Sequence, residues 1–95
     1  MKYIDVRWLH SNPEEPVRLV SELGPDGFET RKIEFWLDGR IGYATEESAS
    51  EGTRLGEVPI PDISEINAQE EFVAREIDSP SFEELWTRCV GGLDR

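Results

Sequence analysis

His10 is the residue best suited to acid–base chemistry in this chain of 95 residues, because it is the single histidine. An imidazole titrates near neutral pH, and one paired with Glu14 or Glu15 would form a general base. The spacing of the sequence pairs it with no Ser, Thr or Cys nucleophile. We therefore favour the alternative, a histidine at the end of a strand that makes a structural hydrogen bond.

Arg54 is a candidate for binding an anion, since it lies in an otherwise acidic stretch and its planar guanidinium fits a carboxylate or phosphate. The alternative is that Arg54 ties its loop down through a carboxylate or a carbonyl group. A pocket that combined Trp8, His10 and Arg54 would indicate a small-ligand-binding protein or a minor enzyme.

Motifs for metals, phosphates and hydrolytic nucleophiles are absent from the sequence. Zinc sites use several His or Cys ligands, and the chain has one of each, His10 and Cys89. Glu46, Glu47 and Glu51 lack the spacing of a calcium loop, so we interpret them as solvated charges. The lone Cys89 is interpreted as a small buried residue rather than a nucleophile. We expect no catalytic residue, no metal and no cofactor.

The charge is strongly negative, with 21 acidic and 10 basic residues and a net charge of -11. Residues 1–44 contribute eight acidic and six basic side chains (net -2), and residues 45–95 contribute thirteen and four (net -9). Such a balance opposes binding to nucleic acid or to an anionic membrane and favours a basic protein partner. The sequence has no apolar stretch of membrane-spanning length and no signal peptide, which together with the lone cysteine predicts a cytoplasmic protein.

Alternation of apolar and polar residues predicts four antiparallel strands, and Phe72 to Ile77 is expected to form a short edge strand. The predicted fold is α+β, a single domain over residues 1–95 in which a sheet of at least four strands in meander order carries a C-terminal amphipathic helix on one face. The four strands are predicted at residues 2–10, 17–23, 28–37 and 40–44.

The predicted C-terminal helix covers about residues 80–90. Ser79-Pro80 opens it, because proline is tolerated at the first helical position, and residues 81–84 also match a capping box. Gly91-Gly92 ends it. A long connection is expected over residues 45–62, followed by a short helix at about 63–69 with Ile63 and Ile66 inward. Three apolar residues of the connection, Leu55, Val58 and Ile60, should hold it against the body. The helix has an apolar stripe at i, i+3, i+4, i+7 and i+8, formed by Phe82, Leu85, Trp86, Cys89 and Val90.

Asp38-Gly39 between two strands predicts a two-residue type I′ hairpin. That turn would pair Trp36 with Ile41 and Glu34 with Tyr43, and it would make the hairpin apolar on both faces. Trp36, Ile41 and Tyr43 would share one face, either covered by later segments as a second small core or exposed beside Glu34 as a patch for a partner. A homodimer through this Trp36 face or through an exposed strand edge is a further possibility.

The sequence resembles a family of small bacterial proteins known only as a domain of unknown function. That resemblance covers almost the whole chain and implies no activity, so no catalytic residue is transferred from it. In general character the chain is similar to the immunity proteins of toxin systems, and we expect a non-catalytic acidic binding protein, with inhibition of a basic toxin as one form of that role. The motifs behind the resemblance include Trp8-x-His10, Asp38-Gly39-Arg40-x-Gly42-Tyr43-Ala44 and Gly52-Thr53-x-Leu55-Gly56-Glu57-x-Pro59-x-Pro61.

Overall fold

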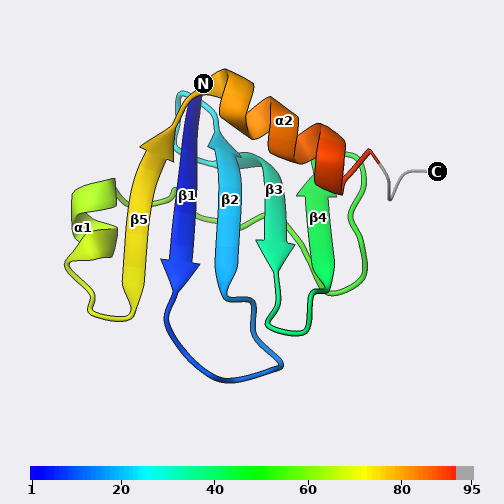
Figure 1. Ribbon diagram of the computed structural model, residues 1–95. Helices are drawn as coiled ribbons and strands as arrows, with labels where there is room; N and C mark the ends of the chain where they lie inside the picture. Colours follow the sequence, from blue (N-terminus) through cyan, green and yellow to red (C-terminus); the bar gives the residue numbers. More distant parts are fainter. Residues whose placement is uncertain (92–95) are drawn as a thin grey trace.

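Five antiparallel strands form one sheet in the order β4-β3-β2-β1-β5, and the C-terminal helix α2 lies across one face of it (Figure 1). The computed structural model describes residues 1–91. It confirms the α+β class and the meander of the first four strands, and the predicted edge strand pairs with β1. The elements are β1 (Lys2–Trp8), β2 (Arg18–Leu23), β3 (Glu29–Phe35), β4 (Ile41–Thr45), α1 (Ile63–Asn67), β5 (Phe72–Ile77) and α2 (Ser79–Cys89).

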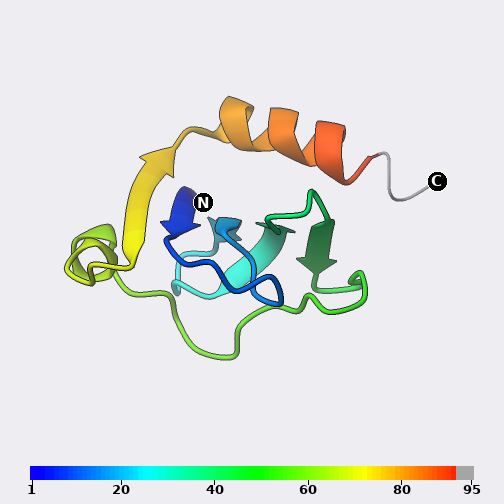
Figure 2. The ribbon, with the colours of Figure 1, turned by 60° about the horizontal axis from the view of Figure 1, so that its bottom comes forward.

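The sheet is covered on both faces, by different parts of the chain (Figure 2). On one face, α2 packs over a core formed by Tyr3, Val20, Ile33, Phe82 and Val90. On the other face, α1 and the connection after β4 cover a second apolar cluster. Alternation places successive side chains of a strand on opposite faces, so both sets of β1 residues are buried. The second cluster consists of Ile4, Val6, Leu23, Ile66 and Ala74.

The predicted apolar stripe of α2 is confirmed, because all five of its residues belong to or pack against the first core. The predicted opening at Ser79-Pro80 is confirmed, but the predicted capping box is wrong. Asp78 is the N-cap, and its side chain accepts a hydrogen bond from the backbone N–H of Ser81 at 2.9 Å. The helix ends at a cap on Val90, and Gly92, which was expected to follow it, lies outside the described residues.

The pairing of β3 with β4 differs from the prediction by one residue: Phe35 faces Ile41 and Ile33 faces Tyr43. A type I′ turn needs positive φ at both central residues, but Gly39 has a φ of +92° and no described residue other than glycine has a positive φ. The Gly39 N–H instead donates to the Trp36 carbonyl, and the Trp36 N–H donates to the Arg40 carbonyl. The chain therefore reverses through a three-residue loop with glycine at its left-handed position.

The corrected register changes the composition of both faces of the hairpin. Phe35 and Tyr43 lie on the α2 face, and Glu34 lies opposite Gly42 on the other, so the hairpin is not apolar on both sides. Gly42 packs closely against the connection after β4. A Cβ added to Gly42 would lie 2.1 Å from the Thr53 Oγ1 atom.

Both edges of the sheet are occupied by this same chain. At β4, the Tyr43 N–H donates to the Ser50 Oγ at 2.8 Å and the Ser50 N–H donates to the Tyr43 carbonyl at 2.9 Å. At β5, the Asn67 side chain donates to the Ala74 carbonyl and accepts from the Ala74 N–H, at 2.9 and 2.7 Å. Unpaired backbone N–H and C=O groups at a sheet edge can pair with a strand of another molecule. The contacts of Ser50 and Asn67 satisfy several of these groups.

We expect Asn67→Ala to lower the free energy of unfolding by about 1–3 kcal/mol, because it leaves the two backbone groups of Ala74 without their partners. It should also increase self-association through the uncovered edge of β5. Urea denaturation and sedimentation velocity at two concentrations measure these effects. Glu65→Ala, at an exposed position of the same helix, is the control, and equal stability and equal association of the two variants would contradict the prediction.

The connection between β4 and α1 is held by fewer apolar contacts than expected. Leu55 and Ile60 are half-buried, and the Ile60 N–H donates to the Gly27 carbonyl at 2.9 Å. Val58 is 68% exposed and does not pin the loop. As predicted, Ile66 of α1 is buried, and Ile63 is half-buried.

Candidate functional site

Part of the sheet remains uncovered on the α2 side. A helix is about 10 Å wide, whereas the seven residues of β1 extend about 23 Å, so one helix that crosses the strands near one end leaves the other end open (Figure 1). The strand register aligns five residues in a row at that open end, one from each strand. We call this row the open face: Val73, Arg7, Arg18, Phe35 and Ile41.

The open face combines apolar and guanidinium groups. Val73 is 52% exposed and Ile41 is 37% exposed. Leu9 and Leu37, both more than half exposed, flank the row where β1 and β3 end. A groove of about 440 Å³ runs along this end of the sheet. Its lining includes Arg7, Arg18 and Phe35 of the row, together with Trp8, Leu9, His10, Val17 and Leu37.

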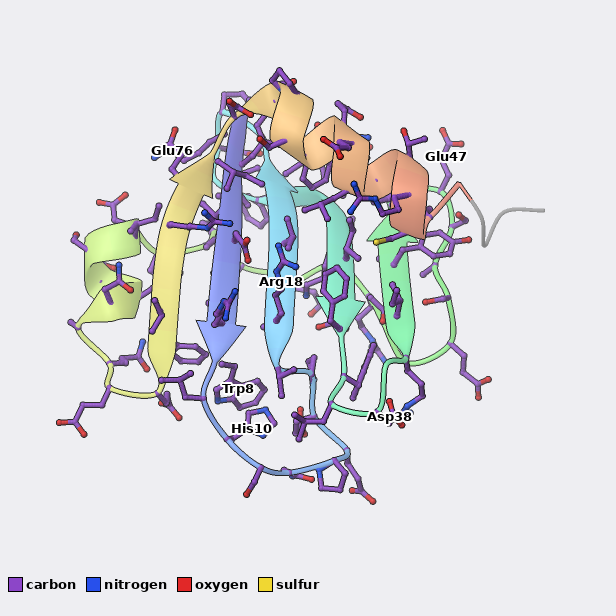
Figure 3. All side chains as sticks on the ribbon, viewed as in Figure 1. Trp8, His10, Arg18, Asp38, Glu47 and Glu76 are labelled. Atoms are coloured by element: carbon purple, nitrogen blue, oxygen red, sulfur yellow. The ribbon has the colours of Figure 1, made fainter. Side chains whose placement is uncertain are left out.

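Arg18 is fixed on the open face by a buried carboxylate. Its Nε and Nη2 atoms donate to the two oxygens of Asp5 at 3.0 and 2.8 Å, and Arg75 donates to the same carboxylate at 3.1 Å. The guanidinium carbon of Arg18 also lies 4.9 Å from the centre of the Phe35 ring, a cation–π distance. Figure 3 shows Arg18 on the part of β2 that α2 leaves uncovered.

The charge of this region is positive although the protein is acidic. Burial of the Asp5 carboxyl opposes its ionisation, yet the hydrogen bonds and charges of Arg18 and Arg75 outweigh burial and hold the pKa of Asp5 below its usual value. Arg7 has no ion pair within residues 1–91. Two guanidinium groups, those of Arg18 and Arg75, therefore contact one carboxylate, and Arg7, paired with Arg18 in the register, is available to an outside anion.

Trp8 and His10 lie side by side (Figure 3), and Arg54 does not join them. Their rings meet edge to face at 4.5 Å. The His10 Nε2 atom lies 2.7 Å from the Pro16 carbonyl, and Nδ1 accepts from the Asn12 N–H at 3.0 Å, so both ring nitrogens are occupied. Arg54 belongs to the connection on the opposite face, where its carbonyl accepts from Lys32 Nζ at 3.2 Å.

The predicted group of Trp36, Ile41 and Tyr43 is not one surface, because the register shift separates its members. Trp36 lies next to the hairpin loop, and the guanidinium carbon of Arg40 is 5.3 Å from the centre of its ring. Ile41 is on the open face, whereas Tyr43 packs toward α2, with its ring 6.2 Å from that of Trp86. Glu34, expected beside this group, is buried on the opposite face, 8% exposed.

Glu34 belongs to a buried charged cluster that the sequence reasoning missed. Lys32 Nζ lies 3.2 Å from the nearer oxygen of Glu29 and 3.9 Å from that of Glu34. Burial raises the pKa of Glu34, and the charge of Lys32 opposes the rise only in part. Alternation along β3 puts Lys32 and Glu34 on one face, but nothing in the sequence indicates that the connection covers that face.

Neither a metal site nor a membrane span is found in the described part of the chain. Within residues 1–91, no group of three or more His, Cys, Asp or Glu side chains is placed to hold a metal ion. None of the described helices is long and apolar enough to cross a membrane.

Residues 2–91 match a family described as "Domain of unknown function (DUF6881)". No curated protein and no solved structure gives a match.

Proposed function

Since the chain belongs to the DUF6881 family, a domain of unknown function, we propose a role from its surface: it is a non-catalytic module that binds a protein partner through the open face. The observation that carries this proposal is the row of Arg7, Arg18 and Phe35 between exposed Val73 and Ile41. Arginine and aromatic residues are enriched where proteins bind one another, and they contribute most of the binding energy.

The sheet edges are already hydrogen-bonded, which favours binding through the open face over binding through an edge strand. Asn67 and Ser50 already occupy outward backbone groups of β5 and β4. A partner strand would have to displace them, whereas the open face requires no rearrangement. Arg18 is also held in place by Asp5 before binding, which lowers the entropy lost when the complex forms.

The partner best suited to the open face presents an apolar surface with at least one carboxylate. Arg7 is exposed and unpaired within residues 1–91, and a carboxylate beside it would form a charge-assisted hydrogen bond. The net charge of the protein favours a basic partner, whereas Arg7 favours a carboxylate at the point of contact. The two preferences differ because net charge attracts a partner at long range and the guanidinium group binds only when the surfaces touch.

A second candidate is the binding of a basic protein, such as a toxin, by the acidic segment of residues 46–71. That segment has eight acidic residues and one basic residue, and the ion pairs within residues 1–91 involve none of its carboxylates. These charges stay uncompensated and would attract a basic surface.

Site-specific photo-crosslinking in the native host separates the two candidates. A photoreactive phenylalanine derivative is placed at Phe35 on the open face or at Val58, which is 68% exposed within the acidic segment. Open-face binding predicts one defined protein crosslinked from position 35 and not from position 58, and a toxin-type interaction predicts the reverse. The same capture from both positions would count against the open face.

A charge reversal tests the role of Arg7 in the same experiment. We expect Arg7→Glu to reduce the affinity for the captured partner at least tenfold, because it places a carboxylate against a carboxylate. Arg54→Glu is the matched control, since Arg54 is also exposed but belongs to the opposite face. Equal binding by the two variants would refute the proposed contact.

A further inference from the structure

A second hollow lies on the opposite face, between the sheet and its covering of connection and α1. Its volume is about 220 Å³. Apolar cavities of about 150 Å³ accept a benzene ring, so this one has room for a single small ring or a short aliphatic chain. The walls are mostly apolar, and the side chains that form them include Ile4, Val6, Leu19, Ile60, Ile66 and Phe72.

Glu29 brings a carboxylate to this apolar cavity. Glu29 and Ser21 both line it, and they are 7% and 2% exposed. The Ser21 hydroxyl donates to Glu29 Oε2 at 2.9 Å, and the Gly56 N–H donates to Oε1 at 2.7 Å. Lys32 Nζ lies 3.2 Å from Oε1. A carboxylate has about four acceptor positions, so these three neighbours leave one, on the oxygen that Ser21 contacts.

The charges around Glu29 do not balance. Two buried carboxylates, Glu29 and Glu34, share the single ammonium group of Lys32. Burial raises the pKa of Glu34 and the negative charge of Glu29 adds to the rise, while the charge of Lys32 opposes it only in part. A further cation at the cavity wall would balance the second carboxylate, whereas an anion would add to the excess.

We propose that this cavity binds a small primary amine, with its apolar body among Ile4, Val6 and Ile66 and its ammonium group against Glu29. The free acceptor position of Glu29 receives one N–H, and the missing positive charge comes from the ligand. The site lies on the face opposite the open face, so it does not depend on the proposed protein-binding role.

Three probes of one shape test the proposal on the full chain: benzylamine, benzyl alcohol and benzoate. Methyl NMR spectra report on Ile4, Val6 and Ile66, which line the cavity. Benzylamine should shift these signals in a saturable way and bind at least tenfold more tightly than benzyl alcohol, and benzoate should leave them unchanged. Equal binding of amine and alcohol, or no saturable shift with the amine, would overturn the proposal.

Two variants locate the binding. Leu19→Trp places a larger side chain at a half-buried wall of the cavity and should abolish the shifts. Leu37→Trp is the same change at a position 58% exposed beside the open face, and it should bind as the original chain does. Glu29→Gln should remove the preference for the amine. If Glu29→Gln fails to fold, the three probes and the comparison of Leu19→Trp with Leu37→Trp still test whether the amine binds in this cavity. Unchanged binding by Leu19→Trp would refute the site.

Discussion

Replacement of Phe82 by alanine is expected to lower the free energy of unfolding by about 3–5 kcal/mol. Phe82 is 0% exposed and lies at the centre of the contact between α2 and the sheet. Its ring is 5.0 Å from the ring of Tyr3 and 5.9 Å from that of Trp86. A cavity at this point would remove contacts from both layers at once, and small domains have about 5–15 kcal/mol of stability in total.

Urea denaturation followed by tryptophan fluorescence measures this loss. Thr87→Ala is the control, since Thr87 is an exposed residue of the same helix, and we expect it to change the stability by less than about 0.5 kcal/mol. The guanidinium of Arg31, 4.8 Å from the centre of the Phe82 ring, should lose its cation–π contact in the Phe82→Ala variant. A loss below about 1 kcal/mol would show that α2 is not anchored by this ring.

The elements most successfully predicted from the sequence are those whose signal is local. The strands follow from alternation and α2 from the spacing of Phe82, Trp86 and Val90, because each pattern is fixed by the geometry of the backbone itself. The pairing of β1 with β2 is almost as local, since consecutive strands with no element between them usually lie side by side. These signals were sufficient for the α+β class and the order of the first four strands.

The hairpin register could not be predicted, because the residues around Asp38-Gly39 suit both a two-residue turn and a three-residue loop. The two turns give registers that differ by one residue. Asp38-Gly39 suits a type I′ turn, in which both residues have positive φ, and also a three-residue loop in which glycine alone does. The Asp38 carboxylate accepts from the Arg40 N–H at 3.0 Å, which favours the longer loop. A one-residue slip moves side chains to the other face, so the error separated Trp36 from Tyr43.

The open face could not be predicted from the sequence, because its residues are far apart in the chain. Its five residues come from five strands, and only the complete set of pairings aligns them. Alternation alone marks Arg7 and Arg18 only as polar positions of half-buried strands. The width of a single helix then decides which part of that face stays uncovered, and no local pattern encodes that outcome.

The carboxylate of Asp5 holds Arg18 on the open face and also contributes to the stability of the fold. Its removal is expected to cause the second largest loss of unfolding free energy. Asp5→Ala should cost about 2–4 kcal/mol, because the part-buried guanidinium of Arg18 loses both its hydrogen bonds and its countercharge. Arg75→Ala should cost much less, since the Arg75 side chain is 70% exposed and solvent screens its charge. If the two variants lost the same free energy of unfolding, the Asp5–Arg18 pair would not be the main stabilising contact of this carboxylate.

The same pair makes a prediction about pH whose sign is fixed. Because the pKa of Asp5 is lower in the folded than in the unfolded chain, the ionised carboxylate stabilises the fold above the ordinary aspartate pKa of about 3.9. This contribution is lost as the pH falls below that value and through the lower folded pKa. Asp5→Asn should therefore be the less stable protein at pH 7, and the difference should shrink steadily between about pH 5 and pH 2. Urea titrations of both proteins across that range test it, and a difference that stays constant would show that Arg18 is held by shape and not by charge.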